Sequence, residues 1–366
     1  MNQICIIEAN ASGHRSKYVQ IITQALKDHN VTLLLSRNFQ KEEQTHNFHQ
    51  YIYFNKKIPT EKIPKNSVVI IPMFDDWMKS LRILTILKLS CFRRDLNYIL
   101  ILINSTFIYG SKVSANSRLI RKLRKFLLQA LATTIYKRTA HWVTIDKKLQ
   151  DWLKTFIPPS RVHFIQDPTL IPKPQVEERP NKVHNKDNSL LFFGAHSKRK
   201  GTAWAILALS KYYRGHLFIR IAGQIEKRER RAIDVAIKKL PKSISYEIND
   251  GFIDDDEAIR MLAEAKAVAL PYIDFGSSSG VINLAWSHQK PVVCSDFGQM
   301  SELVNKNGGG LTFLPNNPKH FCEKVSELMQ GKHDLTTALK YTQRGSIKNF
   351  KASIWNIVKL AQQIES

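Results

Sequence analysis

Cysteine is scarce in this sequence and forms no pattern. The 366 residues include four cysteines, with no CxxC pair and no spacing typical of a metal site: Cys5, Cys91, Cys294 and Cys322. A disulfide-stapled scaffold and a zinc module are therefore excluded. The scattered thiols are typical of a reduced, cytoplasmic protein.

Long hydrophobic runs are also missing. No stretch of about 20 residues is apolar and free of charge, so the sequence predicts no membrane-spanning helix. The amino terminus, MNQICIIEAN, passes directly into an apolar strand pattern, and we therefore expect no signal peptide. These absences predict a cytoplasmic protein and leave open a peripheral attachment to the inner face of the cytoplasmic membrane.

Acidic residues are few relative to basic ones. Lys and Arg number 55 against 31 Asp and Glu, which sets a formal net charge of +24 and a pI near 9.8. A field of this sign favours nucleic acid, an anionic lipid surface or phosphorylated ligands as partners. Because no zinc-finger, RRM or basic-zipper pattern occurs, we expect no nucleic-acid partner.

What the sequence does contain is an alternation of short apolar strands, polar loops and helices. The pattern starts at Ile4–Glu8 and starts again at Leu190–Phe193. It predicts an α/β protein of two Rossmann-like domains with parallel sheets and a cleft between them. We place the domains at 1–172 and 189–335, a linker at 173–188, and C-terminal helices at 336–366 that pack back toward the N-terminal domain.

Two N-terminal segments, 77–94 and 118–131, combine apolar and basic residues at helical spacing. In the second, leucine, isoleucine and phenylalanine interleave with Arg118, Arg121, Lys122, Arg124 and Lys125. At about 100° per residue this predicts an apolar face with a cationic edge. Such a helix suits the surface of an anionic membrane, and a core helix with a basic outer face fits equally well.

The stretch from Pro271 to Asp296 concentrates small polar residues at one point. An apolar strand ends at Pro271, the loop 275–280 (FGSSSG) carries almost no bulk, and a helix-compatible segment begins at Val281. Backbone N–H groups at the start of a helix, together with the helix dipole, favour an anion such as phosphate. By itself the pattern is more typical of an ordinary strand-to-helix turn.

Four further motifs flank this stretch in a fixed order. They are FFGAHSKRKG (192–201), IRIAGQ (219–224), GFIDDDEAIRMLAEAKAVALPY (251–272) and SDFGQMSELVNKNGGGLTF (295–313). With the 271–296 stretch, the series resembles the nucleotide-sugar-binding domain of the retaining GT-B glycosyltransferases of the group 1, or family 4, type. The resemblance implies a GT-B architecture and covers about 120 residues, and the order of the motifs makes it more specific than any one of them.

The resemblance implies a set of donor-binding residues in four places: Gly194, His196 and Lys200 in the first turn, Gly223 after the second strand, Gly251 and Ile253 beside the base, and Ser277, Ser278, Ser279, Gly280, Val281 and Asn283 in the loop and helix. It assigns catalysis to Lys200, as a cation at the donor phosphates, and to His14. His14 and Gly13 resemble the loop that approaches donor and acceptor, although a structural hydrogen bond explains His14 equally well. The family uses basic side chains and the helix dipole in place of a metal, so we expect no metal and no cofactor besides the nucleotide-sugar substrate.

Three positions depart from the family's pattern. Ala195 stands where the family usually carries an arginine, although His196 and Arg199 are close by. Gly276 and Leu284 stand where it carries paired glutamates that hold the donor sugar and the ribose. A branch of the family has a Ser-Ser-Gly loop here, and this sequence resembles that branch.

The sequence therefore predicts a retaining, metal-independent glycosyltransferase of hexosyltransferase type. It would move a sugar from a nucleotide-sugar donor to a saccharide or lipid-linked saccharide acceptor, in the synthesis of a cell-surface polysaccharide. The alternative is a non-catalytic GT-B relative that binds a glycan or a partner protein. The missing carboxylates favour this alternative.

Overall fold

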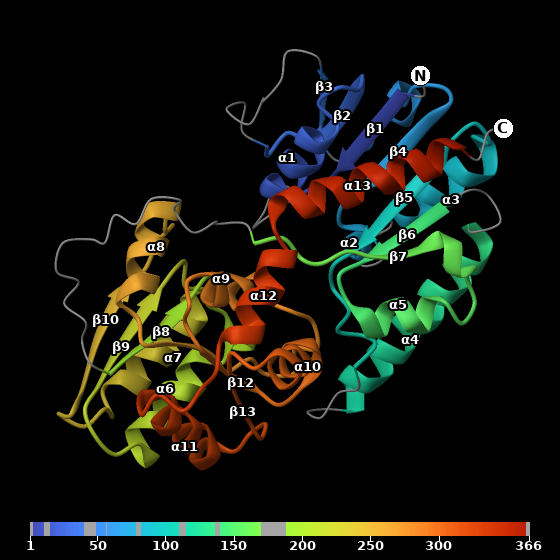
Figure 1. Ribbon diagram of the computed structural model, residues 1–366. Helices are drawn as coiled ribbons and strands as arrows, with labels where there is room; N and C mark the ends of the chain where they lie inside the picture. Colours follow the sequence, from blue (N-terminus) through green and yellow to red (C-terminus); the bar gives the residue numbers. More distant parts are fainter. Residues whose placement is uncertain are drawn as a thin grey trace. The chain divides into compact units, whose positions relative to one another are not determined.

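The structure is a computed structural model that describes residues 3–10, 15–39, 49–55, 57–77, 82–109, 115–135, 140–169 and 188–363. The chain divides into two compact units (Figure 1). Unit 1 comprises Met1–Asp167 and Ile347–Ser366, and unit 2 comprises Pro168–Ser346. In the part of the chain that is described, no helix is both long enough and apolar enough to cross a membrane.

Unit 1 is built on a seven-stranded parallel sheet in the order β3-β2-β1-β4-β5-β6-β7. Its strands are β1 (Gln3–Glu8), β2 (Val31–Ser36), β3 (His49–Phe54), β4 (Ser67–Ile71), β5 (Asn97–Leu102), β6 (Ala140–Thr144) and β7 (Val162–Phe164). Every residue of β2, β4, β5 and β6 is buried. Continuous burial is expected when helices cover both faces of a parallel sheet.

The α-helices of unit 1 come from both ends of the chain: α1 (Arg15–Ala25), α2 (Phe74–Trp77), α3 (Ile83–Phe92), α4 (Ala115–Ile135), α5 (Lys147–Leu153) and α13 (Ile347–Gln362). Helix α13 packs against α1 and against β4, β5 and β6. The amide of Asn97 donates to the carbonyl oxygen of Ala361 at 3.0 Å, which ties this last helix to the sheet.

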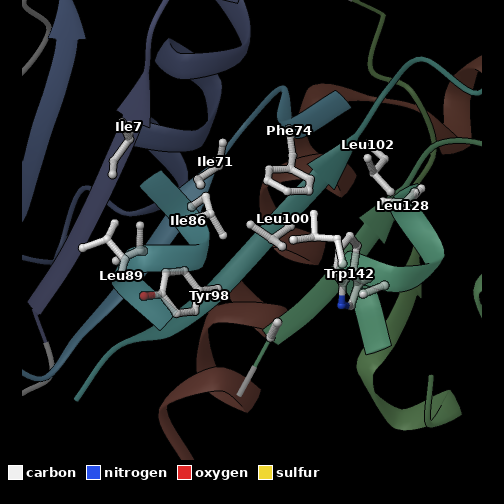
Figure 2. Close-up of a cluster of buried hydrophobic side chains, with 14 of the residues drawn as sticks. Ile7, Ile71, Phe74, Ile86, Leu89, Tyr98, Leu100, Leu102, Leu128 and Trp142 are labelled. Carbon is white, nitrogen blue, oxygen red and sulfur yellow. The ribbon is translucent and has the colours of Figure 1, made fainter. Parts of the chain in front are cut away.

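The core of unit 1 joins the sheet to helices α3 and α4 (Figure 2). Phe74 and Trp142 meet edge to face, with their ring centroids 5.8 Å apart. Leu128 of α4 is fully buried beside them in the same cluster. Burial of such side chains contributes roughly 1.5–3 kcal/mol each to folding, so the cluster holds both helices onto the sheet.

Unit 2 carries a six-stranded parallel sheet in the order β10-β9-β8-β11-β12-β13. Its strands are β8 (Ser189–Phe193), β9 (Leu217–Ala222), β10 (Ile244–Asn249), β11 (Ala267–Leu270), β12 (Val292–Ser295) and β13 (Gly310–Phe313). Its α-helices are α6 (Thr202–Tyr212), α7 (Lys227–Ile237), α8 (Asp255–Glu264), α9 (Gly280–Ser287), α10 (Gly298–Asn307), α11 (Pro318–Met329) and α12 (Thr336–Arg344).

The strand order reverses direction between β8 and β11. The chain adds β9 and β10 on one side of β8, then returns to pair β11 with β8 and continues outward through β12 and β13. Ligands of open parallel sheets bind beyond the carboxyl ends of the strands at such a reversal, because the loops diverge there. In unit 2 the loops at this point are the turn at 194–201 and the loop at 271–280.

The two parallel sheets confirm the predicted fold class of two Rossmann-like α/β domains. The boundary between the units falls at Asp167, and the linker predicted at 173–188 lies, except for Asn188, outside the described residues. The C-terminal boundary falls at residue 346 rather than 335, because α12 belongs to unit 2. There Tyr341 packs edge-on against Trp286 of α9, with 5.9 Å between ring centroids.

Candidate active site

The turn after β8 lies against the end of β9. The backbone N–H of Gly194 donates to the carbonyl oxygen of Ala222 at 2.9 Å, and that of His196 donates to Gln224 at 2.7 Å. Gly223 has φ +126°, and a Cβ there would lie 2.7 Å from the carbonyl carbon of Gly194. Only glycine fits both constraints, so Gly223 acts in the site by letting the two turns approach each other.

His196 is a structural member of this turn. Its side chain is 1% exposed, Nε2 lies 3.2 Å from the carbonyl oxygen of Ala222, and Nδ1 lies 2.9 Å from Oγ1 of Thr202. The carbonyl can only accept, so Nε2 carries the proton and Nδ1 accepts from the threonine. Both ring nitrogens are used inside unit 2, and His196 therefore shapes the site without facing a ligand.

This arrangement predicts that acid destabilises the protein through His196. Burial, and secondarily the charge of Lys200, lowers the pKa of His196 from 6.5 to about 4. The unfolded chain therefore binds the proton first, so the stabilisation is complete above pH 6.5 and is lost as the pH falls toward 4. The loss amounts to about 3 kcal/mol.

Urea unfolding between pH 7 and 4 measures this loss. The free energy of unfolding of His196→Gln should depend less steeply on pH than that of the wild type. His216→Gln, at an exposed position, is the matched control and should keep the wild-type slope. Parallel curves for His196→Gln and the wild type would show that His196 is not held neutral by the fold.

Lys200 brings a cation into the interior of the site. It ends a short 3-10 turn at Lys198–Lys200 and is 8% exposed. Its Nζ donates to the hydroxyl oxygen of Tyr272 and lies 4.4 Å from the centroid of that ring. A Cβ on Gly194 would lie 3.4 Å from Nζ, so the glycine leaves room beside the ammonium group. A cation in such a low-dielectric place attracts an anion more strongly than one in water.

Tyr272 links Lys200 to the start of helix α9. Its hydroxyl lies 2.8 Å from Oγ of Ser279, the N-cap of the helix, and Oγ accepts from the N–H of Val281 at 3.4 Å. The Tyr272 oxygen accepts from Lys200, so the tyrosine O–H donates to Oγ of Ser279. The O–H of Ser279 then remains to donate to an acceptor at the start of the helix. Lysine, tyrosine and serine thus form one hydrogen-bonded chain.

A second cation lies on the same loop. The guanidinium of Arg199 stacks over the ring of Phe275 at 4.2 Å, and the carbonyl oxygen of Arg199 accepts from the N–H of Ile273 at 2.8 Å. Arg199 is exposed, so its charge is available to a ligand. It supplies positive charge within the same turn as Ala195, the position at which the group 1 glycosyltransferases that this sequence resembles usually carry an arginine.

The turn between β12 and α10 supports the serine loop from behind. Gln299 accepts the N–H of Ser278 on its side-chain oxygen at 2.9 Å and donates its own N–H to the carbonyl oxygen of Gly276 at 2.8 Å. Oγ of Ser278 has no hydrogen-bond partner within the described parts of the chain and is itself buried. An unpaired hydroxyl of this kind is a polar group that a ligand or water would satisfy.

The remaining predicted residues divide by exposure. Gly251 and Ile253 follow β10 and are partly exposed, and Gly280 opens helix α9 with no atom within 4 Å of a Cβ built on it. Ser277, Val281 and Asn283 are buried, at 2%, 6% and 1% exposure. The serine loop therefore offers Ser279 and Gly280 at its surface, whereas Ser278 is partly exposed with its Oγ buried. Leu284, at the place of a family glutamate, belongs to the apolar core of unit 2.

Gly13 and His14 lie outside the described residues. Earlier in the sequence, Glu8 ends β1, is 1% exposed, and lies 3.6 Å from Arg15. Burial raises the pKa of Glu8 to about 7, against the lowering effect of Arg15. Asp75 lies in α2, and its side-chain oxygen accepts the N–H of Ile103 at 3.1 Å.

Sequence reasoning missed two residues of this site, Tyr272 and Gln299. Tyr272 follows Pro271 at the end of β11, a carboxyl-end position next to the serine loop, and that position was the available signal. Gln299 gave no signal, because its contact with Ser278 spans 21 residues of sequence.

The assembled geometry can hold a diphosphate. Lys200, the exposed Arg199 and the N-terminus of α9 place positive charge around one loop, and Ser279 adds a hydroxyl donor. Anions are favoured where N–H groups and a helix dipole converge with cations. Within the described ranges no group of three or more His, Cys, Asp or Glu could hold a metal ion.

Comparison with known proteins identifies a matching family model and similar folds. Residues 187–331 match the family described as Glycosyl transferases group 1. The Anabaena protein Alr3699/HepE in complex with UDP and glucose is 14% identical, with a TM-score of 0.70 over 98% of this chain and 100% of that one. The fold is GT-B.

Two further GT-B structures cover the chain as fully. Sucrose-phosphate synthase from Thermosynechococcus elongatus is 14% identical, with a TM-score of 0.70 over 100% of this chain and 99% of that one. The lipopolysaccharide outer core galactosyltransferase WaaB, in its apo form, is 11% identical, with a TM-score of 0.64 over 98% of this chain and 100% of that one. Comparison with curated protein sequences yields no match. In this GT-B chain the group 1 match runs from β8 to α11, and it includes every element of the site described above.

Proposed function

We propose that the protein is a glycosyltransferase that moves a sugar from a nucleotide-sugar donor to a saccharide or lipid-linked saccharide acceptor. The donor binds in unit 2, with its diphosphate at the start of α9. The reaction retains the anomeric configuration, needs no metal, and serves the synthesis of a cell-surface polysaccharide. The HepE structures, which contain UDP or UDP-glucose, make a uridine nucleotide the first donor to test.

The hydrogen-bonded chain from Lys200 through Tyr272 to Ser279 carries this proposal. It joins the buried cation of one loop to the helix start of the other, at the strand reversal where ligands of parallel sheets bind. A structural ion pair would need a carboxylate beside Lys200, and the contacts that its Nζ makes among the described residues are the hydroxyl of Tyr272 and, at 3.5 Å, the carbonyl oxygen of Phe193. The ammonium charge is therefore left for an anionic ligand.

Breaking the bond between sugar and diphosphate leaves negative charge on the departing phosphate. Lys200 and the donors at the start of α9 stabilise that charge, which is greater in the transition state than in the bound donor. They take the role that a divalent cation has in other phosphate-transfer sites. The departing phosphate itself helps to deprotonate the acceptor, which attacks from the same face.

In this protein the donor sugar cannot be held by the paired glutamates of the family that the sequence resembles, so other groups must contact it. Gly276 and Leu284 offer no carboxylate; Ser279 is a partly exposed hydroxyl residue of the loop, and the buried, unpaired Oγ of Ser278 lies beside it in the sequence. Hydroxyls bind sugar hydroxyls less strongly than carboxylates do, because hydrogen bonds to charged groups are the stronger ones. We therefore expect the diphosphate to supply most of the donor affinity.

Thermal unfolding with nucleoside diphosphates tests the proposal. UDP, GDP and ADP at saturating concentration are compared, and one of them should raise the unfolding midpoint by about 5 °C or more. Sugar nucleotides of the same base are then assayed for hydrolysis and transfer. A midpoint that responds to no nucleotide would overturn the proposal. Binding of a sugar nucleotide with neither hydrolysis nor transfer would favour the non-catalytic alternative.

A further inference from the structure

Helix α4 carries apolar side chains on two sides. Leu128, Leu131 and Ala132 are buried in the core of unit 1, where Figure 2 shows Leu128 beside Leu102. A second apolar set is exposed, at 68%, 50%, 56%, 66% and 46% respectively: Leu119, Ile120, Leu123, Phe126 and Leu127. At about 100° per residue these five fall within an arc of about 120°, roughly opposite Leu128. We name them the outer face of α4.

The structure corrects the predicted membrane-facing charges at one position. Arg121 was expected to face an anionic membrane, but it is 8% exposed and donates to the carbonyl oxygen of Tyr109 at 3.0 Å. It lies on the inner side of the helix, on the same side as Leu128. The sequence pattern predicted one apolar face with a cationic edge, and the helix has a second, outward apolar face.

Cations frame the outer face. Lys122 is exposed beside one edge of the arc, with the exposed Arg118 further round on the same side, and Arg124 is partly exposed beside the other edge. Lys125 lies over the ring of Trp152 in α5, at 5.2 Å. Helix α4 contains no aspartate or glutamate, and the sequence has none between Asp95 and Asp146. The outer face is therefore apolar at its centre and positive at its rim.

A contiguous exposed apolar patch marks an interaction surface, whereas single exposed apolar residues need no explanation. The basic side chains around the outer face distinguish between two possible partners, a second copy of the chain and a lipid bilayer. A second copy of the chain would bring like charges together around its own outer face, which costs energy. A bilayer with anionic headgroups offers an apolar interior to the leucines and phenylalanine and a negative surface to the lysine and arginines.

We infer that the outer face of α4 docks on an anionic lipid surface, with α4 lying in the plane of the interface. Leu123 occupies the centre of the arc and Phe126 lies at one edge of it, and both side chains enter the boundary between headgroups and acyl chains, while Arg118 and Lys122 contact phosphate groups. This inference does not depend on the donor site, because all its residues belong to unit 1.

Cosedimentation with vesicles tests this inference without any sugar nucleotide. Phosphatidylcholine vesicles with and without phosphatidylglycerol are compared at 0.1 M salt. The wild type should bind the anionic vesicles at least tenfold more strongly than the neutral ones. Leu123→Ser/Phe126→Ser should lower that affinity tenfold or more, and Arg118→Glu/Lys122→Glu should abolish the preference for anionic lipid.

Val235→Ser is the matched control. Val235 is 56% exposed on α7, another helix rich in lysine and arginine. Among the described residues of α7 it is the single large apolar side chain that is exposed, so α7 has a basic surface without an apolar patch. It should bind vesicles as the wild type does. All variants change exposed side chains, and unchanged unfolding midpoints would show that they fold.

Three results would overturn the inference. One is wild-type binding that does not distinguish anionic from neutral vesicles. Another is a Leu123→Ser/Phe126→Ser variant that binds as tightly as the wild type. The third is a wild type that is dimeric in light scattering and becomes monomeric in that variant, because a second copy would then cover the outer face. None of these results bears on nucleotide binding, so they are separable from a failure of the proposed function.

Discussion

Lys200→Ala should lower turnover by about 10²-fold or more, the loss that follows removal of one group stabilising developing charge. The ammonium group is buried, so no water takes over its role at low cost. The measurement is the initial rate of sugar transfer, or of sugar-nucleotide hydrolysis, at saturating donor. Because the charge stabilises the transition state more than the bound donor, kcat should fall more than the donor KM rises.

Lys198→Ala is the matched control for this loss. Lys198 lies in the same turn but is exposed, so its removal should change turnover by less than about threefold, as expected for a solvated charge. Tyr272→Phe removes the hydroxyl that links Lys200 to Ser279. In this variant the ammonium charge of Lys200 remains but loses the hydrogen bond that positions it. Full turnover in Lys200→Ala would rule out the catalytic role of Lys200, whatever the behaviour of Tyr272→Phe.

Two glycine-to-alanine changes should separate the donor site from its scaffold. Gly223→Ala should destabilise unit 2 by more than about 3 kcal/mol, because it combines a disfavoured φ with a collision against Gly194. Gly280→Ala should leave the free energy of unfolding unchanged or raise it by up to about 1 kcal/mol, since alanine favours the helix and meets no atom within 4 Å.

The same Gly280→Ala change should weaken nucleotide binding at least tenfold. The empty space beside Gly280 is where a phosphate approaching the start of α9 would lie, and a methyl group there would hold it away. Urea unfolding and isothermal titration with the nucleotide that stabilises the wild type measure the two effects. A variant that binds nucleotide as tightly as the wild type would place the diphosphate elsewhere.

Most strands could be predicted because their signal is local. Ile4–Glu8 and Leu190–Phe193 are short, mostly apolar runs that a parallel sheet buries on both faces. Strand β3 was missed. It starts with His49 and Gln50 and pairs on one side only, with β2. An edge strand buries less surface and so carries a weaker apolar pattern.

The part of the candidate site that could be predicted is the part specified by residue types and by the order of the motifs. Lys200 and the loop at Ser278–Gly280 were predicted as donor contacts, and both border the strand reversal. The role of His196 could not be inferred from sequence, since it depends on Thr202 and Ala222 approaching its ring from two elements. The same applies to Tyr272, whose hydroxyl contacts Lys200, 72 residues earlier in the chain, and Ser279, 7 residues later.

The sequence by itself determined the alternation of strands and helices, the excess of positive charge and the ordered motifs that resemble those of a nucleotide-sugar-binding domain. Each of these is a property of neighbouring residues. The tertiary structure alone decided which residues of α4 face the core, that Arg121 is buried, and that Tyr272 joins Lys200 to Ser279. The physical reason is that burial and hydrogen bonding depend on which distant segments approach, and helical spacing alone does not specify on which side of α4 the sheet lies.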